Sequence, residues 1–229
     1  MDWRAACAAV IPCRNEQAAI GPLVEAVRRF LPAVFVINDE STDATASRAR
    51  AAGATVLENP LGPGKGAALQ TGWRRAAREH FQWAINLDGD GQHCAADIPA
   101  FLQCAESAPV SLVCGNRMAQ AARMPPLRRW VNVWMSRRIS ALTGQSLPDS
   151  QCGFRLMSLG DWARLPVGAR HFEIESEVLF LFARAGLPIR FVPVATIYQQ
   201  ERSKIRPWRD SVRWLRWYRQ ARRRARARA

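Results

Sequence analysis

The sequence predicts an α/β protein built on a mainly parallel sheet with helices on both of its faces. Short apolar runs alternate along the chain with segments in which apolar residues recur at helical spacing. The apolar runs are continuous, as in strands that are buried on both faces. The chain has 229 residues, of which 48% are hydrophobic and 23% charged, which is enough to bury one large core.

The predicted elements follow one another in a regular order. The run at residues 8–11 predicts the first strand, and Ile20, Leu23, Val24 and Val27 have the spacing of an amphipathic helix. Further strands are predicted at 34–37, 55–57, 83–87, 110–114 and 189–194, and further helices at 41–52, 66–80, 97–106, 127–142 and 173–185. We expect one catalytic domain over residues 1–204 and a basic, aromatic-rich helix and tail over 205–229.

Positive charge is concentrated at the C-terminal end. The net charge is +14, and residues 202–229 hold 12 basic residues and one acidic residue, so they carry +11. Such a segment suits an anionic lipid surface, a nucleic acid or an acidic protein, unless it is only a solvated tail. Trp208, Leu215 and Tyr218 recur at helical spacing, which favours a helix lying on an anionic membrane. The alternatives are that this helix packs on the body of the protein, or docks on a partner membrane protein.

No run of 18 apolar residues occurs, and the first residues do not resemble a signal peptide. The six cysteines form no CxxC pair, so we expect neither a zinc ribbon nor disulfides. These features lead us to expect a cytoplasmic protein that is peripheral at the inner face of the cytoplasmic membrane.

Acidic residues follow several predicted strands, at the sheet edge where open parallel sheets bind ligands. Asp88 and Asp90 follow the strand at 83–87, and two carboxylates at this spacing can converge on Mg²⁺ or Mn²⁺. Gln92 and His93 would complete or orient that site. The alternative is an ordinary surface turn, because Asp-Gly pairs often form turns.

Asp39 and a glycine-rich loop have two interpretations each. Asp39 ends the second strand and would either accept hydrogen bonds from a nucleotide or cap the next helix. The loop around Lys65 lacks the spacing of a phosphate-binding P-loop. Its Gly62-x-Gly64-x-x-Ala67 pattern does fit a dinucleotide fingerprint, so an NAD-dependent oxidoreductase remains an alternative.

Taken in order, these motifs resemble family 2 glycosyltransferases, which have the GT-A nucleotide-sugar-binding fold and invert the anomeric centre. The resemblance runs over about residues 5 to 210. Its second half is similar to the dolichyl- and polyprenyl-phosphate sugar transferase branch. The motifs that carry it are Ala9-Val10-Ile11-Pro12 with Asn15-Glu16, Ile37 to Asp43, Asn59 to Gly72, Asp88 to His93, Gly115-Asn116-Arg117, Asp149 to Arg155, Phe172 to Glu175 and Arg202-Ser203-Lys204.

The resemblance assigns roles to individual residues. It implies that Pro12, Glu16 and Asp39 hold the nucleotide, with Lys65 and Asp88 also on the nucleotide sugar, and that Asp88, Asp90 and Gln92 hold Mg²⁺ or Mn²⁺. The acceptor phosphate would be held by Arg117, an arginine of the Arg128-Arg129 pair, Arg155, Arg202 and Lys204. Members of the family commonly have two aspartates where Asn38 and Asp39 stand, often a glycine at Glu40, and often an arginine at Tyr198.

The expected reaction moves a sugar from a UDP- or GDP-linked donor to a polyprenyl-phosphate-type or other lipid acceptor. A phosphate acceptor is already ionised near neutral pH and needs no general base. A hydroxyl acceptor would need one, and Asp149 and Glu175 are the candidates. Their alternative role is an ion pair with Arg155 or Arg117. A non-catalytic protein that binds membranes or nucleic acid also remains open, although the acidic loops would repel nucleic acid.

Overall fold

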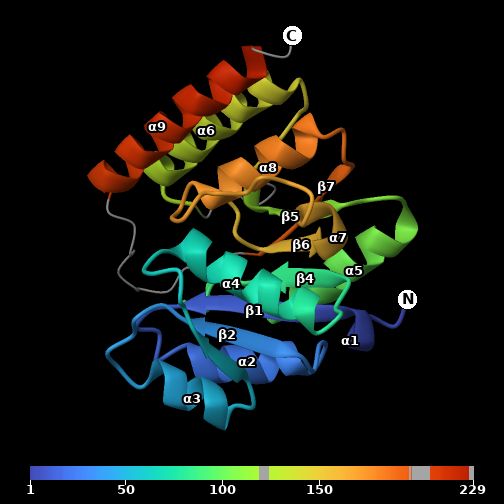
Figure 1. Cartoon of the computed structure of the whole chain (residues 1–229), viewed down its shortest axis with the longest axis vertical. Helices are drawn as coiled ribbons and strands as arrows, with labels where there is room; N and C mark the ends of the chain where they lie inside the picture. The colour runs from blue at the N-terminus through green and yellow to red at the C-terminus, as the bar shows by residue number, and fades with distance from the viewer. Residues whose placement is uncertain (119–123, 196, 198–206, 227–229) are drawn as a thin grey trace.

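A computed structural model of the chain describes residues 1–118, 124–195, 197 and 207–226. Its centre is a seven-stranded sheet with the order β3-β2-β1-β4-β6-β5-β7 (Figure 1). Within this sheet β6 alone runs antiparallel to its neighbours β4 and β5. The strands are β1 (Cys7–Cys13), β2 (Val34–Asn38), β3 (Thr55–Glu58), β4 (Trp83–Asn86), β5 (Leu112–Asn116), β6 (Arg155–Ser158) and β7 (Ile189–Pro193).

Helices cover both faces of this sheet. One face carries α2 (Ile20–Arg28), α3 (Thr45–Ala51) and α5 (Ile98–Ser107), with α1 (Trp3–Ala6) at the edge and the short η1 (Ala95–Asp97) before α5. The other carries α4 (Lys65–Arg78), α6 (Pro126–Thr143), α7 (Leu159–Trp162), α8 (Ile174–Arg184) and α9 (Pro207–Arg226). The chain therefore has the predicted α/β architecture.

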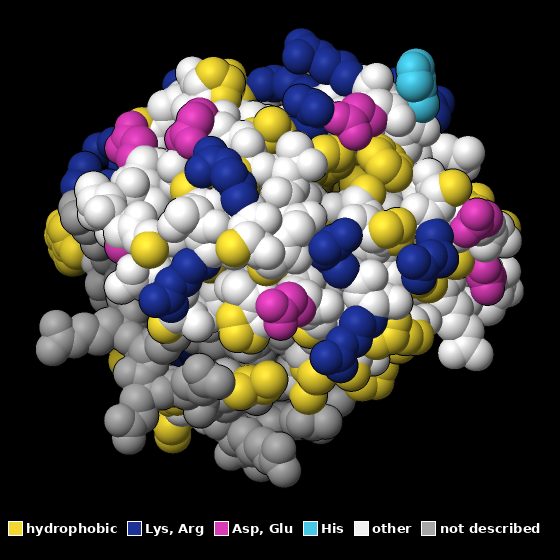
Figure 2. Space-filling model, turned by 90° about the horizontal axis from the view of Figure 1, so that it is seen from below, with side chains coloured by type: hydrophobic (Ala, Val, Ile, Leu, Met, Phe, Trp, Pro, Cys, Tyr) yellow, Lys and Arg dark blue, Asp and Glu magenta, His cyan; other side chains and the backbone are white. Residues whose placement is uncertain are grey.

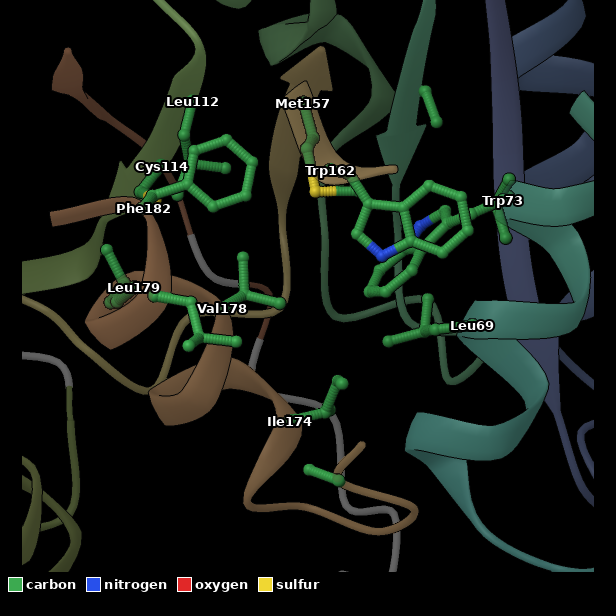
Figure 3. Close-up of a cluster of buried hydrophobic side chains, with 14 of the residues drawn as sticks. Leu69, Trp73, Leu112, Cys114, Met157, Trp162, Ile174, Val178, Leu179 and Phe182 are labelled. Carbon is green, nitrogen blue, oxygen red and sulfur yellow. The ribbon is translucent and has the colours of Figure 1, made fainter. Parts of the chain in front are cut away.

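The two apolar cores follow from the alternation of side chains along the strands. In β1, Ala8 and Val10 point into one core while Ala9 and Ile11 point into the other. Both strand faces are covered, so β1 and β2 are buried along their whole length. Figure 3 shows the core on the α4 and α8 side, where Trp73 and Trp162 meet edge to face.

The C-terminal helix packs on the body through part of its aromatic surface. Trp214 and Trp217 are buried, and the Trp214 ring lies 5.4 Å from Trp134 of α6 and 5.2 Å from Tyr218. Trp214 and Trp217 belong to the core, so this part of the helix packs on the body of the protein, which was the alternative to a helix on a membrane. Trp208, at the start of the same helix, remains 83% exposed.

The structure differs from the expectation in a few elements. The strand β6 was not predicted, because Arg155–Ser158 is short and begins with an arginine. The helix expected at 41–52 begins at Thr45, where Ala44 occupies the cap position and Asp43 accepts a hydrogen bond from Thr45 N. None of the helices in the described part of the chain is both long and apolar enough to cross a membrane.

The packing of α4 on the sheet leaves no room for a side chain at Gly72, which can be tested by substitution. A Cβ atom on Gly72 would lie 2.3 Å from Val10 Cγ1, so Gly72→Ala should lower the free energy of unfolding by about 1–3 kcal/mol through overpacking. Gly21→Ala in α2 is the control, since nothing lies within 4 Å, and it should raise that energy by about 0.5–1 kcal/mol. Urea denaturation measures both, and equal stabilities of the two variants would contradict the packing.

Candidate active site

Lys65 joins three elements at the carboxyl edge of the sheet. It is the first residue of α4, and its Nζ lies 2.5 Å from Asp88 Oδ1, after β4, and 2.7 Å from Glu175 Oε1, in the first turn of α8. Burial alone would lower the pKa of Lys65, but the two carboxylates outweigh burial and raise it. Burial would raise the pKa of Asp88, and Lys65 and His93 together lower it. Lys65 and Asp88 are therefore both charged at neutral pH.

The Asp88-Gly89-Asp90 turn lies against the end of β1. A Cβ atom on Gly89 would lie 2.4 Å from Cys13 Sγ, 3.1 Å from the Pro12 carbonyl oxygen and 3.4 Å from Glu16 Cγ. Only glycine fits there, so the turn approaches the loop that contains Pro12 and Glu16.

The side chains of Asp88 and Asp90 have polar neighbours at this turn. Asp90 Oδ1 accepts a hydrogen bond from Gln92 N at 3.0 Å, and His93 Nε2 lies 3.3 Å from Asp88 Oδ2. A Cβ atom on Gly153 would lie only 2.8 Å from Asp88 Oδ1, so the glycine keeps that side chain accessible. Carboxylate oxygens such as those of Asp88 and Asp90 suit Mg²⁺ or Mn²⁺. Within the described residues, no group of three or more His, Cys, Asp or Glu side chains could hold a metal by itself.

Asp39 organises the glycine-rich loop. Its side chain is buried and accepts hydrogen bonds from Asn59 Nδ2 at 2.8 Å and from Gly64 N at 3.0 Å. Gly64 has a φ of 143°, and a Cβ atom there would lie 2.2 Å from the Arg170 carbonyl oxygen. Asp39 therefore does not cap α3. It holds the loop that begins α4 and so positions Lys65.

Arg117 and Asp149 form a buried bidentate ion pair. Arg117 Nε and Nη2 donate to Asp149 at 2.8 and 2.9 Å, and the backbone N of Arg117 donates at 3.1 Å. Asn132 of α6 donates to the same carboxylate at 2.8 Å. Burial alone would raise the pKa of Asp149, but Arg117 and Asn132 outweigh burial and lower it. Asp88 is among the neighbours that raise the pKa of Arg117 against its burial, so the pair lies within electrostatic reach of Asp88.

The remaining predicted acceptor residues lie in different surroundings. Arg155 is buried and donates to the carbonyl oxygens of Ser150, Cys152 and Glu175, at 2.6–2.9 Å, so it ties the segment before β6 to the start of α8. Arg128 is half-buried and Arg129 is exposed at the start of α6. Arg202 and Lys204 lie outside the described residues.

Glu177 supports the site, although sequence reasoning did not single it out. It is buried, and its Oε2 accepts from Gly168 N at 2.8 Å and from Ala169 N at 2.6 Å. The carbonyl oxygen of the next residue, Arg170, accepts from Ala67 N in the first turn of α4. The available signal was a carboxylate directly before the apolar run of 178–183 in α8, because a buried acid requires donors.

Several known proteins are similar to this chain in sequence. The model of glycosyl transferase family 2 matches residues 8–160. A UDP-N-acetylglucosamine–dolichyl-phosphate N-acetylglucosaminyltransferase of Methanococcus voltae is 30% identical over 149 residues, covering 63% of this chain and 59% of that protein. An undecaprenyl-phosphate mannosyltransferase of Micrococcus luteus is 24% identical over 204 residues, covering 83% of each.

The fold also has close counterparts among solved structures. Glucosyl-3-phosphoglycerate synthase from Mycobacterium tuberculosis, in complex with Mn²⁺, uridine diphosphate and phosphoglyceric acid, aligns with a TM-score of 0.72. The identity is 22%, and the alignment covers 92% of this chain and 75% of that one. This likeness concerns the fold, and it confirms the GT-A architecture expected from the sequence.

The Arg117–Asp149 pair leads to a pH-dependent prediction. Asp149→Asn should lower the free energy of unfolding by about 3–5 kcal/mol at neutral pH, because it leaves a buried guanidinium unpaired. The pKa of Asp149 is lowered in the folded protein. The full difference in free energy of unfolding between the variant and the unaltered chain is therefore expected above the pKa of an unfolded aspartate, about 3.9. It should shrink as the pH falls below that value toward the folded pKa.

Denaturant titrations at several pH values measure this difference. Asp161→Asn is the matched control, since Asp161 pairs with Arg164, whose side chain is 77% exposed, and should cost at most about 1 kcal/mol. An Asp149→Asn cost that stays constant down to the lowest pH would contradict the assignment.

Proposed function

Because this chain belongs to glycosyl transferase family 2, we propose that it transfers a sugar, with inversion, from a nucleoside diphosphate sugar to a polyprenyl-phosphate-type lipid acceptor. The observation that carries the proposal is the meeting of Asp88, Lys65 and Glu175 at the sheet edge, with Arg117 in electrostatic reach. The names of the two relatives, a dolichyl-phosphate and an undecaprenyl-phosphate transferase, support a lipid phosphate as acceptor.

The donor half of the site would use the ends of β1, β2 and β4. Pro12, Glu16 and Asp39 would contact the nucleotide, whether it is UDP or GDP, and Lys65 would contact its diphosphate. Asp88 and Asp90, with Gln92, would hold Mg²⁺ or Mn²⁺, and the diphosphate would supply the ligands that the chain does not. When bound, the metal neutralises negative charge on the leaving diphosphate.

The acceptor half would use the Arg117–Asp149 pair. The two side-chain bonds to Asp149 use two of the five N–H donors of the guanidinium, so donors remain for a phosphate in a fixed orientation. Arg128, Arg129, Arg202 and Lys204 are proposed as further phosphate contacts. We assign Arg155 a positioning role instead, because its three bonds go to backbone carbonyls.

A phosphate acceptor also agrees with the state of the two candidate bases. Asp149 is paired with Arg117, which lowers its pKa and makes it a weak base. Glu175 is paired with Lys65 at 2.7 Å. An acceptor phosphate, which is already ionised, requires neither of them to remove a proton. We therefore propose that both carboxylates act as positioning groups.

The alternatives have less support. The Gly62-x-Gly64-x-x-Ala67 loop follows β3, and the Cβ positions of Gly64 and Gly66 face the backbone of residues 169–171 within the protein, so these glycines serve internal packing. Membership of a glycosyltransferase family also favours an enzyme over a non-catalytic protein that binds membranes or nucleic acid. We propose a location at the inner face of the cytoplasmic membrane, supported by the lipid-phosphate acceptors in the names of the two relatives.

The proposal is tested by a transfer assay with labelled UDP- and GDP-sugars, a polyprenyl phosphate, and Mn²⁺ or Mg²⁺. Transfer should need both the lipid phosphate and the metal. Chains that hydrolyse donors but transfer to no lipid phosphate would contradict the acceptor, and a chain that binds NAD and no nucleoside diphosphate would contradict the donor.

For the metal, we predict that Asp90→Asn lowers transfer by about a thousandfold or more, because one charged ligand is lost. The fold should persist, since Asp90 is only half-buried. Glu25→Gln, on the exposed surface of α2, is the control and should transfer normally. Circular dichroism checks the fold, and activity that survives EDTA would argue against the metal.

For the acceptor, we predict that Arg117→Lys lowers kcat/KM for the lipid phosphate by about tenfold to a hundredfold, while donor affinity changes little. Lysine keeps the charge but loses the planar, two-donor geometry. Arg164→Lys, at an exposed arginine, is the matched control. Titration calorimetry measures donor binding, and an equal loss of donor affinity would assign Arg117 to the diphosphate.

A further inference from the structure

We infer that the beginnings of α6 and α9 form the surface by which this protein docks on an anionic lipid bilayer. We define the docking surface as Leu127, Trp130 and Val131 of α6 with Trp208 of α9. The exposed fractions of Leu127, Trp130 and Trp208 are 74%, 65% and 83%, whereas most large apolar side chains of the described residues are covered. The inference rests on the proposed function, because a lipid acceptor requires the enzyme to reach a bilayer.

The four side chains belong to one end of the molecule. The two helices lie side by side and begin at the same end, near the end of the sheet toward which β1 points (Figure 1). Trp134 of α6 and Trp214 of α9 are level, with ring centroids 5.4 Å apart. Trp130 lies one turn before Trp134, and Trp208 lies less than two turns before Trp214. Both exposed indoles therefore lie on the same side of that contact.

The charge of these helices complements an anionic surface. Together α6 and α9 hold 12 arginines and one acidic residue, Asp210. Figure 2 shows the molecule from below Figure 1, from the side away from α6 and α9, and there basic and acidic side chains are interspersed. Tryptophan rings and arginines suit the headgroup region, where the ring contacts the acyl boundary and guanidinium groups meet lipid phosphates. Exposed apolar side chains such as Leu127 gain from a bilayer but gain little from a nucleic acid backbone.

The inner surfaces of the same helices hold the candidate site. Asn132, one residue after Val131, donates to Asp149 of the Arg117 pair. Trp214 Nε1 donates to Ser176 Oγ at 2.9 Å, and Ser176 follows Glu175 directly. Gln151, in the segment before β6, donates to the same hydroxyl at 3.0 Å. Docking through the outer surface would therefore bring Arg117 and Glu175 to the membrane with the helices.

The experiment is sedimentation of the full chain with vesicles of phosphatidylcholine alone or mixed with phosphatidylglycerol. The unaltered chain should pellet with the mixed vesicles, and less so at high salt. Leu127→Ser/Trp130→Ser/Trp208→Ser should lower the partition coefficient about tenfold or more, because these side chains would no longer leave water. Arg209→Gln/Arg216→Gln should lower it about tenfold on mixed vesicles only.

Two matched variants separate docking from general effects. Trp130→Phe/Trp208→Phe keeps apolar rings and should bind nearly as well as the unaltered chain. Arg29→Gln/Arg78→Gln removes the same charge from two exposed positions, directly after α2 and at the end of α4, and should leave binding unchanged. The inference is overturned if the serine variant pellets like the unaltered chain, or if duplex DNA binds both and displaces them from vesicles. A chain that transfers sugar to a short-chain polyprenyl phosphate but ignores vesicles overturns this inference alone.

Discussion

One ammonium group, that of Lys65, holds the candidate site together. It lies between Asp88 and Glu175, so it joins the start of α4 to the end of β4 and the start of α8. Without a cation between them, these two carboxylates would repel each other in a partly buried space. Lys65 is the first residue of α4, so its position depends on the backbone conformation of the loop before this helix. Asp39 holds that loop through Gly64 N, and Gly64 and Gly66 allow it to lie close to the backbone of residues 169–171.

Much of the second half of the chain acts as support for that arrangement. Glu177 holds the backbone of residues 168–169, and Arg170 in turn accepts a hydrogen bond from the first turn of α4. Arg155 ties the segment before β6 to the carbonyl oxygen of Glu175. These buried charges are satisfied mainly by backbone groups, so they rigidify loops that have little apolar surface of their own. The site consequently consists of loops held at several points by internal hydrogen bonds.

Local patterns were sufficient to predict most of the fold. The apolar runs and helical spacing predicted the strands from β1 to β5, and β7, to within about two residues. Because parallel strands end at the same edge of a sheet, the sequence also predicted that Asp39 and Asp88 lie at one edge. The contact of Lys65 with Glu175 was beyond reach, because it depends on how α8 packs against α4. Asp39 does not cap α3, and in the folded chain it holds Gly64, which is 25 residues further along the sequence, so local patterns could not predict this contact. The orientation of α9 also depends on packing, because Trp214 contacts α6 and Trp217 contacts α8. The helical spacing of the aromatic residues could not show which of them face the core.

The reversed strand β6 has a consequence for how such a protein can change. Because β6 runs against β4 and β5, its first residue lies at the edge where those strands end. The segment before β6 therefore lies at that same edge. In this segment Gly153 lies against Asp88, and Asp149 pairs with Arg117. A parallel strand in this position would have left the same segment at the far edge. The proposed donor half and the proposed acceptor half are therefore encoded in separate stretches of chain, and the second stretch can diverge in length and composition while the first keeps its geometry.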